Sequence, residues 1–344
     1  MIVSTPSGLY CEAGNFHIDP WQPVERALVT HAHADHASPG STSYLCAAPG
    51  ERVLRRRLPD AAIQTVEYGD RISIGDAAVS FHPAGHILGS AQIRVEHRGE
   101  VWVVSGDYKR QPDPTCVPFE VVPCHTFITE ATFALPIYTW DSPGLVIDEI
   151  MEWWRANREQ RRPSVIFCYV LGKAQRLLAE IRLRPADGDA PIHLHGAMCA
   201  LTDAYRDSGI PLAPAERITE SMRGAALARS LVLAPLSARG TPWMRRLPNA
   251  SAAFASGLMR VRGVRRQRAF DRGFVLSDHA DWPSLLSTIA ETGASRVLVT
   301  HGWSEALARY LQETRGLETG TLRTAFEGEP GELTASESAS EEPE

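Results

Sequence analysis

Residues 30–36 read Thr-His-Ala-His-Ala-Asp-His, and this stretch decides how the whole chain is interpreted. It follows a short apolar run that is typical of a buried strand. In an extended chain, residues two positions apart point to the same side, so His31 and His33 can bind one cation. Asp35 and His36 follow in a turn and can reach a second cation. Imidazole and carboxylate groups are ligands that Zn²⁺ accepts, so the stretch predicts a metal site rather than a polar surface loop.

A site for two cations needs more ligands than one loop supplies, and three later residues have suitable surroundings. Each is one polar residue that ends an apolar run and lies beside glycine. Taken singly, such a residue is also typical of a turn. Together with residues 30–36, the three complete a set of ligands: His86, Asp107 and His301.

The first 110 residues have the pattern of short strands separated by tight turns. Residues 71–81 alternate between apolar and polar, and the runs 91–95 and 101–104 flank a polar turn that indicates a hairpin. The segment after His36 begins with small residues and is expected to turn into a helix.

From about residue 136 the pattern changes to strands that alternate with helices. The expected helices are 145–158 and 172–183, and the expected strands are 164–170, 191–194 and 231–236. This alternation favours a parallel sheet with crossover helices. Strands and loops return near residue 274, and the ordered part closes with a strand at 297–300 and a helix at 304–315.

The composition is that of an ordinary globular protein. The chain has 344 residues, of which 44% are hydrophobic and 22% charged, which suggests two domains. No apolar run approaches the roughly 18 residues of a membrane helix, and the first 11 residues lack the features of a secretory signal. The six cysteines form no CxxC pair and indicate reduced thiols. We therefore expect a cytoplasmic protein without a membrane partner.

The net charge of −6 is concentrated at one end of the chain. Residues 326–344 contain seven Glu and no base, so the remaining residues carry a net charge of +1. Of the 35 basic residues, 33 are Arg, whose planar guanidinium can bind phosphate through two hydrogen bonds. The Arg excess can equally reflect the base composition of the genome, and both interpretations stay open.

The order of the motifs resembles that of a known family. Residues 30–36 followed by Ala84-Gly-His86 and Ser105-Gly-Asp107 are similar to the metallo-β-lactamase superfamily, but these motifs alone are shared with lactamases and glyoxalases. Three later stretches resemble motifs A, B and C of the β-CASP nucleases of that superfamily: Thr129-Glu-Ala-Thr-Phe133, Ser277-Asp-His-Ala-Asp281 and Thr300-His-Gly302. Shorter stretches are most similar to the bacterial ligase-associated DNA exonucleases: 8–11, 16–20 and 237–243.

The resemblance covers about residues 5–325 and implies the fold. It implies an α/β protein, namely a metallo-β-lactamase αββα sandwich with an inserted β-CASP α/β domain. The expected division is 1–134 for the first part of the metallo-β-lactamase domain, 135–273 for the β-CASP domain, 274–325 for the second part of the metallo-β-lactamase domain and 326–344 for a disordered acidic tail.

The resemblance also implies the metal ligands. It assigns two Zn²⁺ ions per chain, one to His31, His33 and His86 and the other to Asp35, His36 and His301, with Asp107 between them. Mn²⁺ accepts the same ligands. Asp19 matches an aspartate that supports the metal-binding loop in the family.

The implied reaction is hydrolysis of a phosphodiester bond. Two cations lower the pKa of a bridging water, and the resulting hydroxide attacks phosphorus. His279 would act as the general acid that protonates the leaving oxygen, and Glu130 would orient His279 and raise its pKa. The implied catalytic residues are Asp35, Asp107, Glu130 and His279.

Contacts to nucleic acid are expected at a basic stretch in the inserted domain. Arginines beside the cleft would bind backbone phosphates, although a solvated loop is the alternative interpretation. A lysine next to motif SGD could also touch a substrate phosphate. The candidate contacts are Lys109, Arg260, Arg262, Arg265, Arg266 and Arg268.

The expected function is a metal-dependent DNA exonuclease that acts on single-stranded DNA in repair, together with an ATP-dependent DNA ligase and a helicase. The main alternative is an RNA-processing β-CASP ribonuclease of the mRNA 3′-end processing type, because a histidine at motif C, here His301, is usual in the RNA-acting branch. A small-molecule metallo-hydrolase would leave motif B unexplained. A nucleic-acid-binding protein with an inactive site conflicts with the complete set of ligands.

Overall fold

The computed structural model describes residues 1–184, 190–263 and 270–322, and the expected acidic tail lies outside them. The chain divides into two compact units, one made of Met1–Thr139 with the segment that starts at His279, the other made of Trp140–Asp278. The expected domain boundaries at residues 134 and 273 lie a few residues before these transitions. Within the first unit, the backbone amide of Trp282 donates a hydrogen bond to the carbonyl of Tyr138, so the ends that flank the second unit lie side by side.

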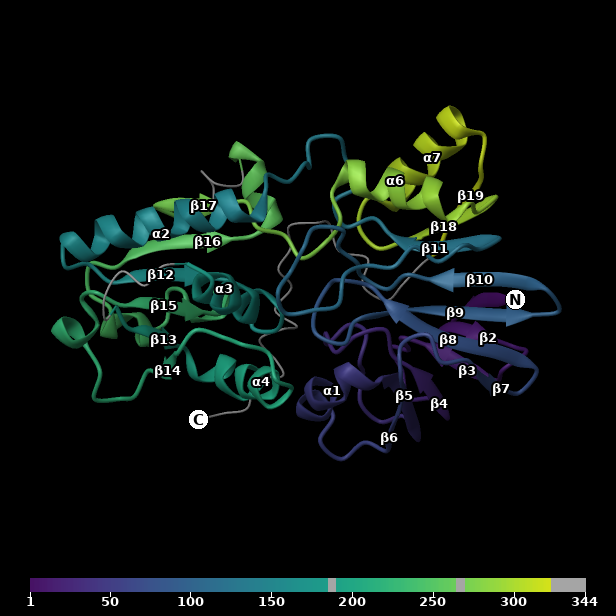
Figure 1. The fold of residues 1–344 in the computed structure, drawn as a ribbon, viewed down its shortest axis with the longest axis horizontal. Helices are drawn as coiled ribbons and strands as arrows, with labels where there is room; N and C mark the ends of the chain where they lie inside the picture. The colour runs from purple at the N-terminus through teal and green to yellow at the C-terminus, as the bar shows by residue number, and fades with distance from the viewer. Residues whose placement is uncertain (185–189, 264–269, 323–344) are drawn as a thin grey trace. The chain divides into compact units, whose positions relative to one another are not determined.

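Two mixed sheets form the body of the first unit (Figure 1). The first has the order β1-β2-β3-β4-β5-β6, with β1 (Ile2–Thr5), β2 (Gly8–Cys11), β3 (Phe16–Ile18), β4 (Arg26–Leu28), β5 (Ser43–Ala47) and β6 (Ile63–Val66). The second has the order β19-β18-β11-β10-β9-β8-β7, with β7 (Ile72–Ile74), β8 (Ala77–Pro83), β9 (Ala91–His97), β10 (Glu100–Val104), β11 (Thr126–Glu130), β18 (Arg296–Thr300) and β19 (Glu318–Thr321).

Strand β10 shows how the two-residue repeat of a strand builds the layers. Trp102 and Val104 contribute to the core between the two sheets, whereas Val103 contributes to the core beneath two helices. These helices are α6 (Trp282–Thr292) and α7 (Ser304–Arg315), while α1 (Glu51–Arg57) lies beside β6 (Figure 1). The expected sandwich of two sheets with outer helices is confirmed.

The direction of the strands determines where their ends meet. β10, β11 and β18 are neighbours that pair in parallel, and β8 runs the same way because it is two antiparallel steps from β10. The carboxyl ends of these four strands therefore lie at one edge of the second sheet.

The second unit contains one sheet of order β14-β13-β15-β12-β16-β17, and all its recorded pairs are parallel. Its strands are β12 (Ser164–Phe167), β13 (Ile192–Leu194), β14 (Glu216–Arg217), β15 (Leu231–Ala234), β16 (Ser251–Ala255) and β17 (Arg272–Phe274). Its helices are α2 (Pro143–Glu159), α3 (Lys173–Arg182) and α4 (Gly196–Asp207). The expected parallel sheet with crossover helices is confirmed.

Short 3₁₀ turns complete the described elements. They are η1 (Ala48–Gly50) in the first unit, and η2 (Gly224–Leu227), η3 (Leu236–Ala238), η4 (Pro242–Arg246) and η5 (Gly257–Arg260) in the second.

One local expectation was wrong. The segment after His36 forms turns instead of a helix and enters β5 at Ser43. Pro39 and Gly40 explain this, because the proline disfavours helical backbone before it and Gly40 has a φ of +95°. The alternating segment 71–81 lies in the hairpin of β7 and β8.

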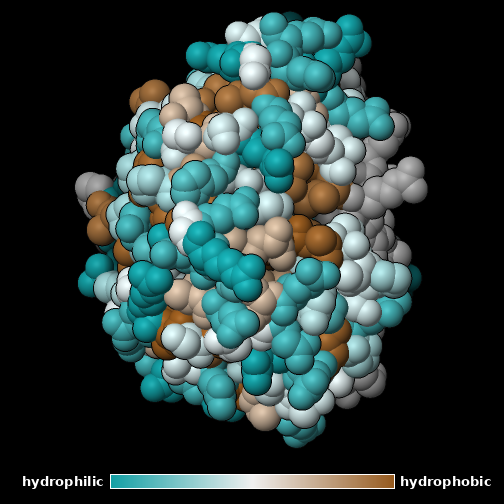
Figure 2. All heavy atoms as spheres, turned by 90° about the vertical axis from the view of Figure 1, so that its right-hand side faces the viewer, coloured by the Kyte–Doolittle hydropathy of each residue, from teal (hydrophilic) through white to brown (hydrophobic). Residues whose placement is uncertain are grey.

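Among the residues that the structure describes, no helix has the length and apolarity needed to cross a membrane. Figure 2 shows one face of the molecule, on which apolar side chains are scattered in small groups among hydrophilic ones.

Candidate metal centre

The predicted ligands all belong to the first unit and follow strands. Residues 31–36 form a loop after β4, and the other ligands come from the carboxyl-terminal edge of the second sheet. There His86 follows β8, Asp107 follows β10 and His301 follows β18. Strands β8, β10 and β18 run in the same direction in one sheet, and each is separated from the next by a single strand. Their carboxyl ends therefore bring residues that are far apart in the sequence to one edge.

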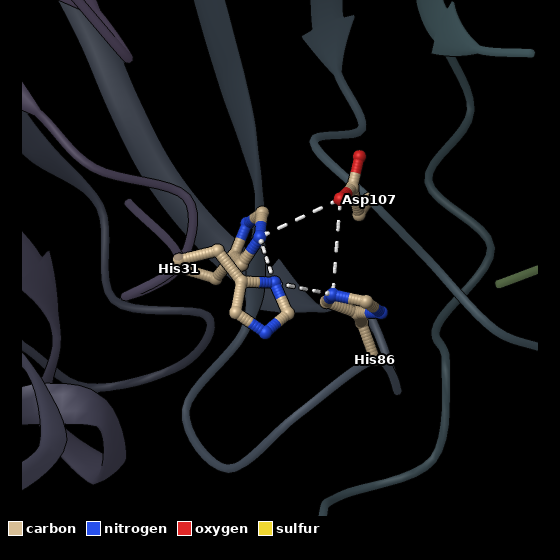
Figure 3. Close-up of side chains that lie close together, drawn as sticks. His31, His86 and Asp107 are labelled. Atoms are coloured by element: carbon tan, nitrogen blue, oxygen red, sulfur yellow. Dashed lines mark hydrogen bonds and ion pairs between the residues drawn. The ribbon is translucent and has the colours of Figure 1, made fainter. Parts of the chain in front are cut away.

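Three histidines and one aspartate form a compact donor set (Figure 3). Nδ1 of His33 lies 3.0 Å from Nε2 of His31 and 3.1 Å from Nε2 of His86. Oδ2 of Asp107 lies 3.6 Å from Nε2 of His31 and 3.8 Å from Nε2 of His86. The ligand atoms of this set all lie within 4.8 Å of one another, which suits a single cation.

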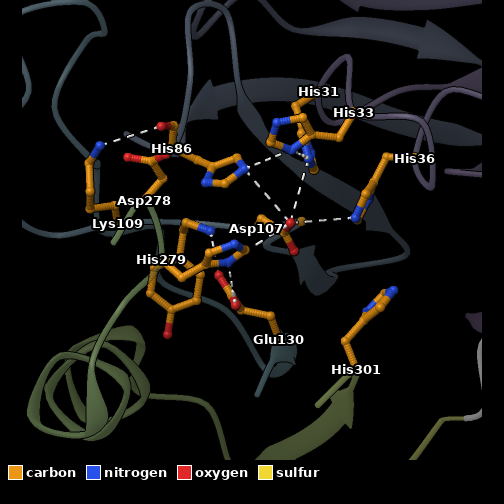
Figure 4. A network of polar contacts seen from close by, with 12 residues as sticks. His31, His33, His36, His86, Asp107, Lys109, Glu130, Asp278, His279 and His301 are labelled. Atoms are coloured by element: carbon orange, nitrogen blue, oxygen red, sulfur yellow. Dashed lines mark hydrogen bonds and ion pairs between the residues drawn. The ribbon is translucent and has the colours of Figure 1, made fainter. Parts of the chain in front are cut away.

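A second group of donors, Asp35, His36 and His301, approaches the same carboxylate oxygen through His36 (Figure 4). Nε2 of His36 lies 3.6 Å from Oδ2 of Asp107 and 3.6 Å from Oδ2 of Asp35. The rings of His36 and His301 are stacked with centroids 5.4 Å apart. Asp35, His36 and His301 also line one pocket, together with Trp21. Oδ2 of Asp107 thus lies between the two groups.

Hydrogen bonds around Asp19 fix which nitrogen of two histidines is free to bind a metal. Oδ2 of Asp19 accepts the Thr30 hydroxyl at 2.6 Å and also contacts Nδ1 of His36 at 2.7 Å. Because the Thr30 hydroxyl donates to Asp19, it accepts from Nδ1 of His31, which is 3.1 Å away. In the neutral form of each ring, the proton therefore resides on Nδ1, and Nε2 of His31 and of His36 is the nitrogen that can bind a metal.

A threonine hydroxyl also binds Nδ1 of His301. The Thr300 hydroxyl donates to the carbonyl of Thr129 at 3.3 Å and accepts from Nδ1 of His301 at 3.0 Å. This leaves Nε2 of His301 as the free nitrogen. His301 has a φ of +55°, a left-handed conformation that is costly for a residue with a Cβ and typical of functional sites.

The donor set fits a divalent metal. Nε2 of His36 is buried and accepts no hydrogen bond from any residue that the structure describes, which is costly unless another group binds it. Nitrogens of several histidines and two carboxylates converge on the same region. These are the donors that Zn²⁺ or a similar ion takes.

Electrostatics favours the neutral, ligand form of His31 and His301 and the protonated form of His36. Burial and the neighbouring imidazoles lower the pKa of His31 far below its ordinary value, and burial together with His36 lowers the pKa of His301 to about 4. Burial would also lower the pKa of His36, but three carboxylates, led by Asp35, raise it well above the usual range. Burial raises the pKa of Asp107 to about 7.

His279 and Glu130 form a pair beside this cluster (Figure 4). Nδ1 of His279 donates to Oε2 of Glu130 at 2.9 Å and lies 3.9 Å from Oδ2 of Asp107. Oε1 of Glu130 accepts the backbone amide of Tyr108 at 2.7 Å. Burial would raise the pKa of Glu130, but the charge of His279 and these hydrogen bonds lower it, so the carboxylate is ionised. Glu130 therefore holds His279 in one orientation, as expected for a positioning residue.

The expected contacts to nucleic acid have a different outcome. Lys109 is buried and its ammonium pairs with Asp113, so it is not available to a substrate phosphate, and that expectation was wrong. Arg260 forms an ion pair with Asp141 at 3.1 Å, and Arg262 is exposed. Arg265, Arg266 and Arg268 lie outside the described residues.

Sequence reasoning missed the two threonines that set the protonation of the ligands. A signal for them exists, because Thr30 and Thr300 each stand directly before a predicted ligand histidine at the end of an apolar strand. The repeated Thr-His pair predicts a hydroxyl beside each ring, but its partners Asp19 and Thr129 become visible only in the fold.

Comparisons with known proteins identify relatives of this chain. No family model matches. A protein named "Probable DNA ligase" from Opitutus terrae is 31% identical over 320 residues, which are 92% of this chain and 30% of that protein. An "RNase J-like protein" from Methanocaldococcus jannaschii is 24% identical over 53% of this chain and 50% of that protein. An "Endoribonuclease ysh1" from Aspergillus fumigatus is 30% identical over 34% of this chain and 13% of that protein.

The chain thus spans half or less of the length of each of these relatives. Among solved structures, a protein of unknown function from Enterococcus faecalis V583 is similar with a TM-score of 0.58 and 12% identity. The similarity covers 89% of this chain and 80% of that one. At this identity it supports the fold alone.

Proposed function

We propose that the chain, as a β-CASP nuclease of the metallo-β-lactamase superfamily, hydrolyses phosphodiester bonds of nucleic acids with bound divalent metal ions. One observation carries the proposal. Oδ2 of Asp107 lies between two sets of metal donors, and the His279–Glu130 pair begins 3.9 Å from the same oxygen. A centre for cations and a group that can move a proton are therefore adjacent.

The ligands divide into two positions around Asp107. His31, His33 and His86 would hold one cation, and Asp35, His36 and His301 would hold the other, with Asp107 shared. We propose Zn²⁺ for both, since histidine nitrogens dominate the set, and Mn²⁺ is the alternative. When bound, such ions lower the pKa of water and neutralise charge on phosphate oxygens.

His279 supplies the proton that the leaving oxygen requires. Its Nδ1 proton is held by Glu130, so Nε2 is the nitrogen from which a second proton can be given to substrate. The buried, ionised Glu130 stabilises the positively charged ring. The pair resembles the arrangement in which a carboxylate orients a catalytic histidine.

Single-stranded DNA is the substrate that we propose first. A relative that matches 92% of this chain carries the name "Probable DNA ligase", which supports a role in DNA repair beside a ligase. A helicase partner follows only from the resemblance. The exposed Arg262 and the nearby basic stretch would contribute contacts to phosphates.

RNA is the second candidate. Two observations favour it, namely the names of the relatives "RNase J-like protein" and "Endoribonuclease ysh1" and the histidine at position 301. Both substrates have the same phosphodiester chemistry, so the metal centre does not distinguish them.

The deciding experiment compares single-stranded DNA and RNA of one sequence, labelled at the 5′ or the 3′ end, with Zn²⁺, Mn²⁺ or no metal added to chelator-treated protein. We expect metal-dependent shortening of DNA that proceeds from one end. Faster cleavage of RNA would favour the second candidate. If neither polymer is cut under any metal while the protein retains bound metal, the proposed nuclease activity is wrong.

A further inference from the structure

The segment after Asp107 lies directly against the loop that carries His86. We define the His86 loop as residues 83–90. The amide of Lys109 donates to the carbonyl of Ala84 at 3.1 Å, and the amide of Glu120 donates to the carbonyl of Pro83 at 3.1 Å. At Gly85, whose φ is +71°, a Cβ atom would come within 2.6 Å of the Lys109 carbonyl oxygen. The two segments therefore pack backbone to backbone.

Lys109 and Asp113 form a buried ion pair at this contact. Nζ of Lys109 lies 2.5 Å from Oδ2 of Asp113, and the exposed fractions of the two side chains are 0% and 3%. Oδ1 of Asp113 accepts the amide of Thr115 at 2.8 Å and its hydroxyl at 2.7 Å. Both oxygens of the carboxylate are thus used, and the ammonium is held in one place.

The ammonium also reaches the metal ligand itself. Nζ of Lys109 donates to the carbonyl oxygen of His86 at 3.4 Å (Figure 4). On the other side of this residue, the His86 amide donates to the Ser90 hydroxyl at 3.0 Å. The backbone of His86 is therefore held at both its amide and its carbonyl.

We propose that the Lys109–Asp113 pair is a positioning device for His86, which sets the affinity of the cation position formed by His31, His33 and His86. The proposal rests on the metal centre of the proposed function. His86 belongs to only one of the two donor groups, so losing the pair weakens that position and leaves the position of Asp35, His36 and His301 intact. Mutation of a residue that holds a metal ligand in place typically lowers metal affinity by about 10–100-fold.

The test measures metal binding rather than catalysis. Metal-free full-length protein is titrated with Zn²⁺ in competition with a chromophoric chelator, and bound metal is counted by elemental analysis. In Lys109→Met we expect one of two equivalents to bind at least about 10-fold more weakly, with the other unchanged. The matched control is Arg110→Met, which removes the neighbouring ion pair with Glu291 at 2.9 Å and leaves the bond from Lys109 to the His86 carbonyl in place. It should bind as the parent protein does.

A double variant separates positioning from folding. Lys109→Met alone leaves Asp113 buried without its cation, which can destabilise the fold. Lys109→Met combined with Asp113→Leu removes both charges, and the His86 carbonyl still lacks its donor. If this double variant binds both Zn²⁺ equivalents with parental affinity, the proposal is overturned. The two charges would then only compensate each other and would not position His86.

One more variant distinguishes the failure of this inference from the failure of the proposed metal centre. His86→Ala must lose one equivalent if the centre is as proposed. If His86→Ala loses it and Lys109→Met does not, the positioning role is wrong and the centre stands. If His86→Ala keeps both equivalents, the assignment of the ligands is wrong.

Discussion

The His279 ring lies beside the proposed metal donors, and its Nδ1 donates to Glu130 at 2.9 Å. We assign it to proton transfer and not to metal binding. His279→Ala should therefore lower kcat by about 10²–10⁴-fold, the usual contribution of a general acid, while bound metal stays at the parental level. Steady-state cleavage rates and elemental analysis on the same preparation check this.

The control for His279 is His82→Ala, which removes a histidine of the same unit that contacts Ser80 and Glu120 instead. It should leave kcat unchanged. Full activity in His279→Ala would exclude this residue from proton transfer.

Unlike His279, Asp107 is expected to affect metal binding. Its Oδ2 faces His31, His36 and His86 within 3.8 Å, so it contributes to both cation positions. Asp107→Asn removes the negative charge but keeps the shape, and we expect metal and activity to be lost together. Two metals per chain in the variant would contradict the shared role.

Single residues also show how far the sequence alone could lead. His86, Asp107 and His301 could be predicted because an apolar strand that ends in one polar residue beside glycine places that residue at a sheet edge. The use of Nδ1 or Nε2 could not be predicted, since it depends on Asp19 and on threonine hydroxyls brought together by the fold. Lys109 was misassigned for the same reason, because its partner Asp113 looks like an ordinary loop residue in the sequence.

At the level of elements, the turn between β10 and Asp107 depends on a glycine. Gly106 has a φ of +55°, and a Cβ there would lie 2.6 Å from the Thr30 hydroxyl oxygen. Gly106→Ala should lower the free energy of unfolding by about 1–2 kcal/mol because alanine disfavours the left-handed backbone. The steric conflict with Thr30 should lower it by about 1–3 kcal/mol more. Urea unfolding of the two proteins measures the difference.

Gly99→Ala is the matched control, because Gly99 has a φ of +82° in the β9–β10 turn but has no atom within 4 Å of its added Cβ. It should show the backbone cost alone. Equal losses in the free energy of unfolding would rule out a conflict with Thr30.

The elements differ in how well periodicity predicts them. The helix at 304–315 and the hairpin of β9 and β10 have long or regular patterns, and both are present. The helix expected after His36 is absent because one Pro-Gly pair outweighs the small residues before it. The turn between β7 and β8 was harder to predict from the sequence, because the apolar–polar alternation continues across Gly75.

For the whole molecule, buried thiols predict sensitivity to alkali. Burial raises the pKa values of Cys46, Cys124 and Cys168 from the ordinary 9.0 to about 12. Between pH 9 and 12 the unfolded chain loses these protons while the folded chain keeps them, so the free energy of unfolding falls as the pH rises. Each thiol contributes a slope of about 1.4 kcal/mol per pH unit.

Urea titrations at pH 8 to 11 test this. Cys168→Ala should make the decrease of the free energy of unfolding with pH less steep, by up to about 1.4 kcal/mol per pH unit. An unchanged slope in this variant would mean that Cys168 ionises as readily in the folded protein as in the unfolded one.

At the same scale, the division into two units could be read from the change of pattern near residue 136, because crossover helices and hairpins have different periods. The points of transition could not be fixed within a few residues, since no composition change marks Thr139 or Asp278.

The hydrogen bond between Trp282 and Tyr138 closes a narrow neck where the polypeptide departs from the first unit and comes back. The second unit, Trp140–Asp278, is an excursion from this neck that supplies none of the seven proposed metal ligands. Evolution can therefore lengthen, shorten or replace the excursion as a cassette, acquiring new polymers to bind, while the ion-holding edge is inherited unchanged.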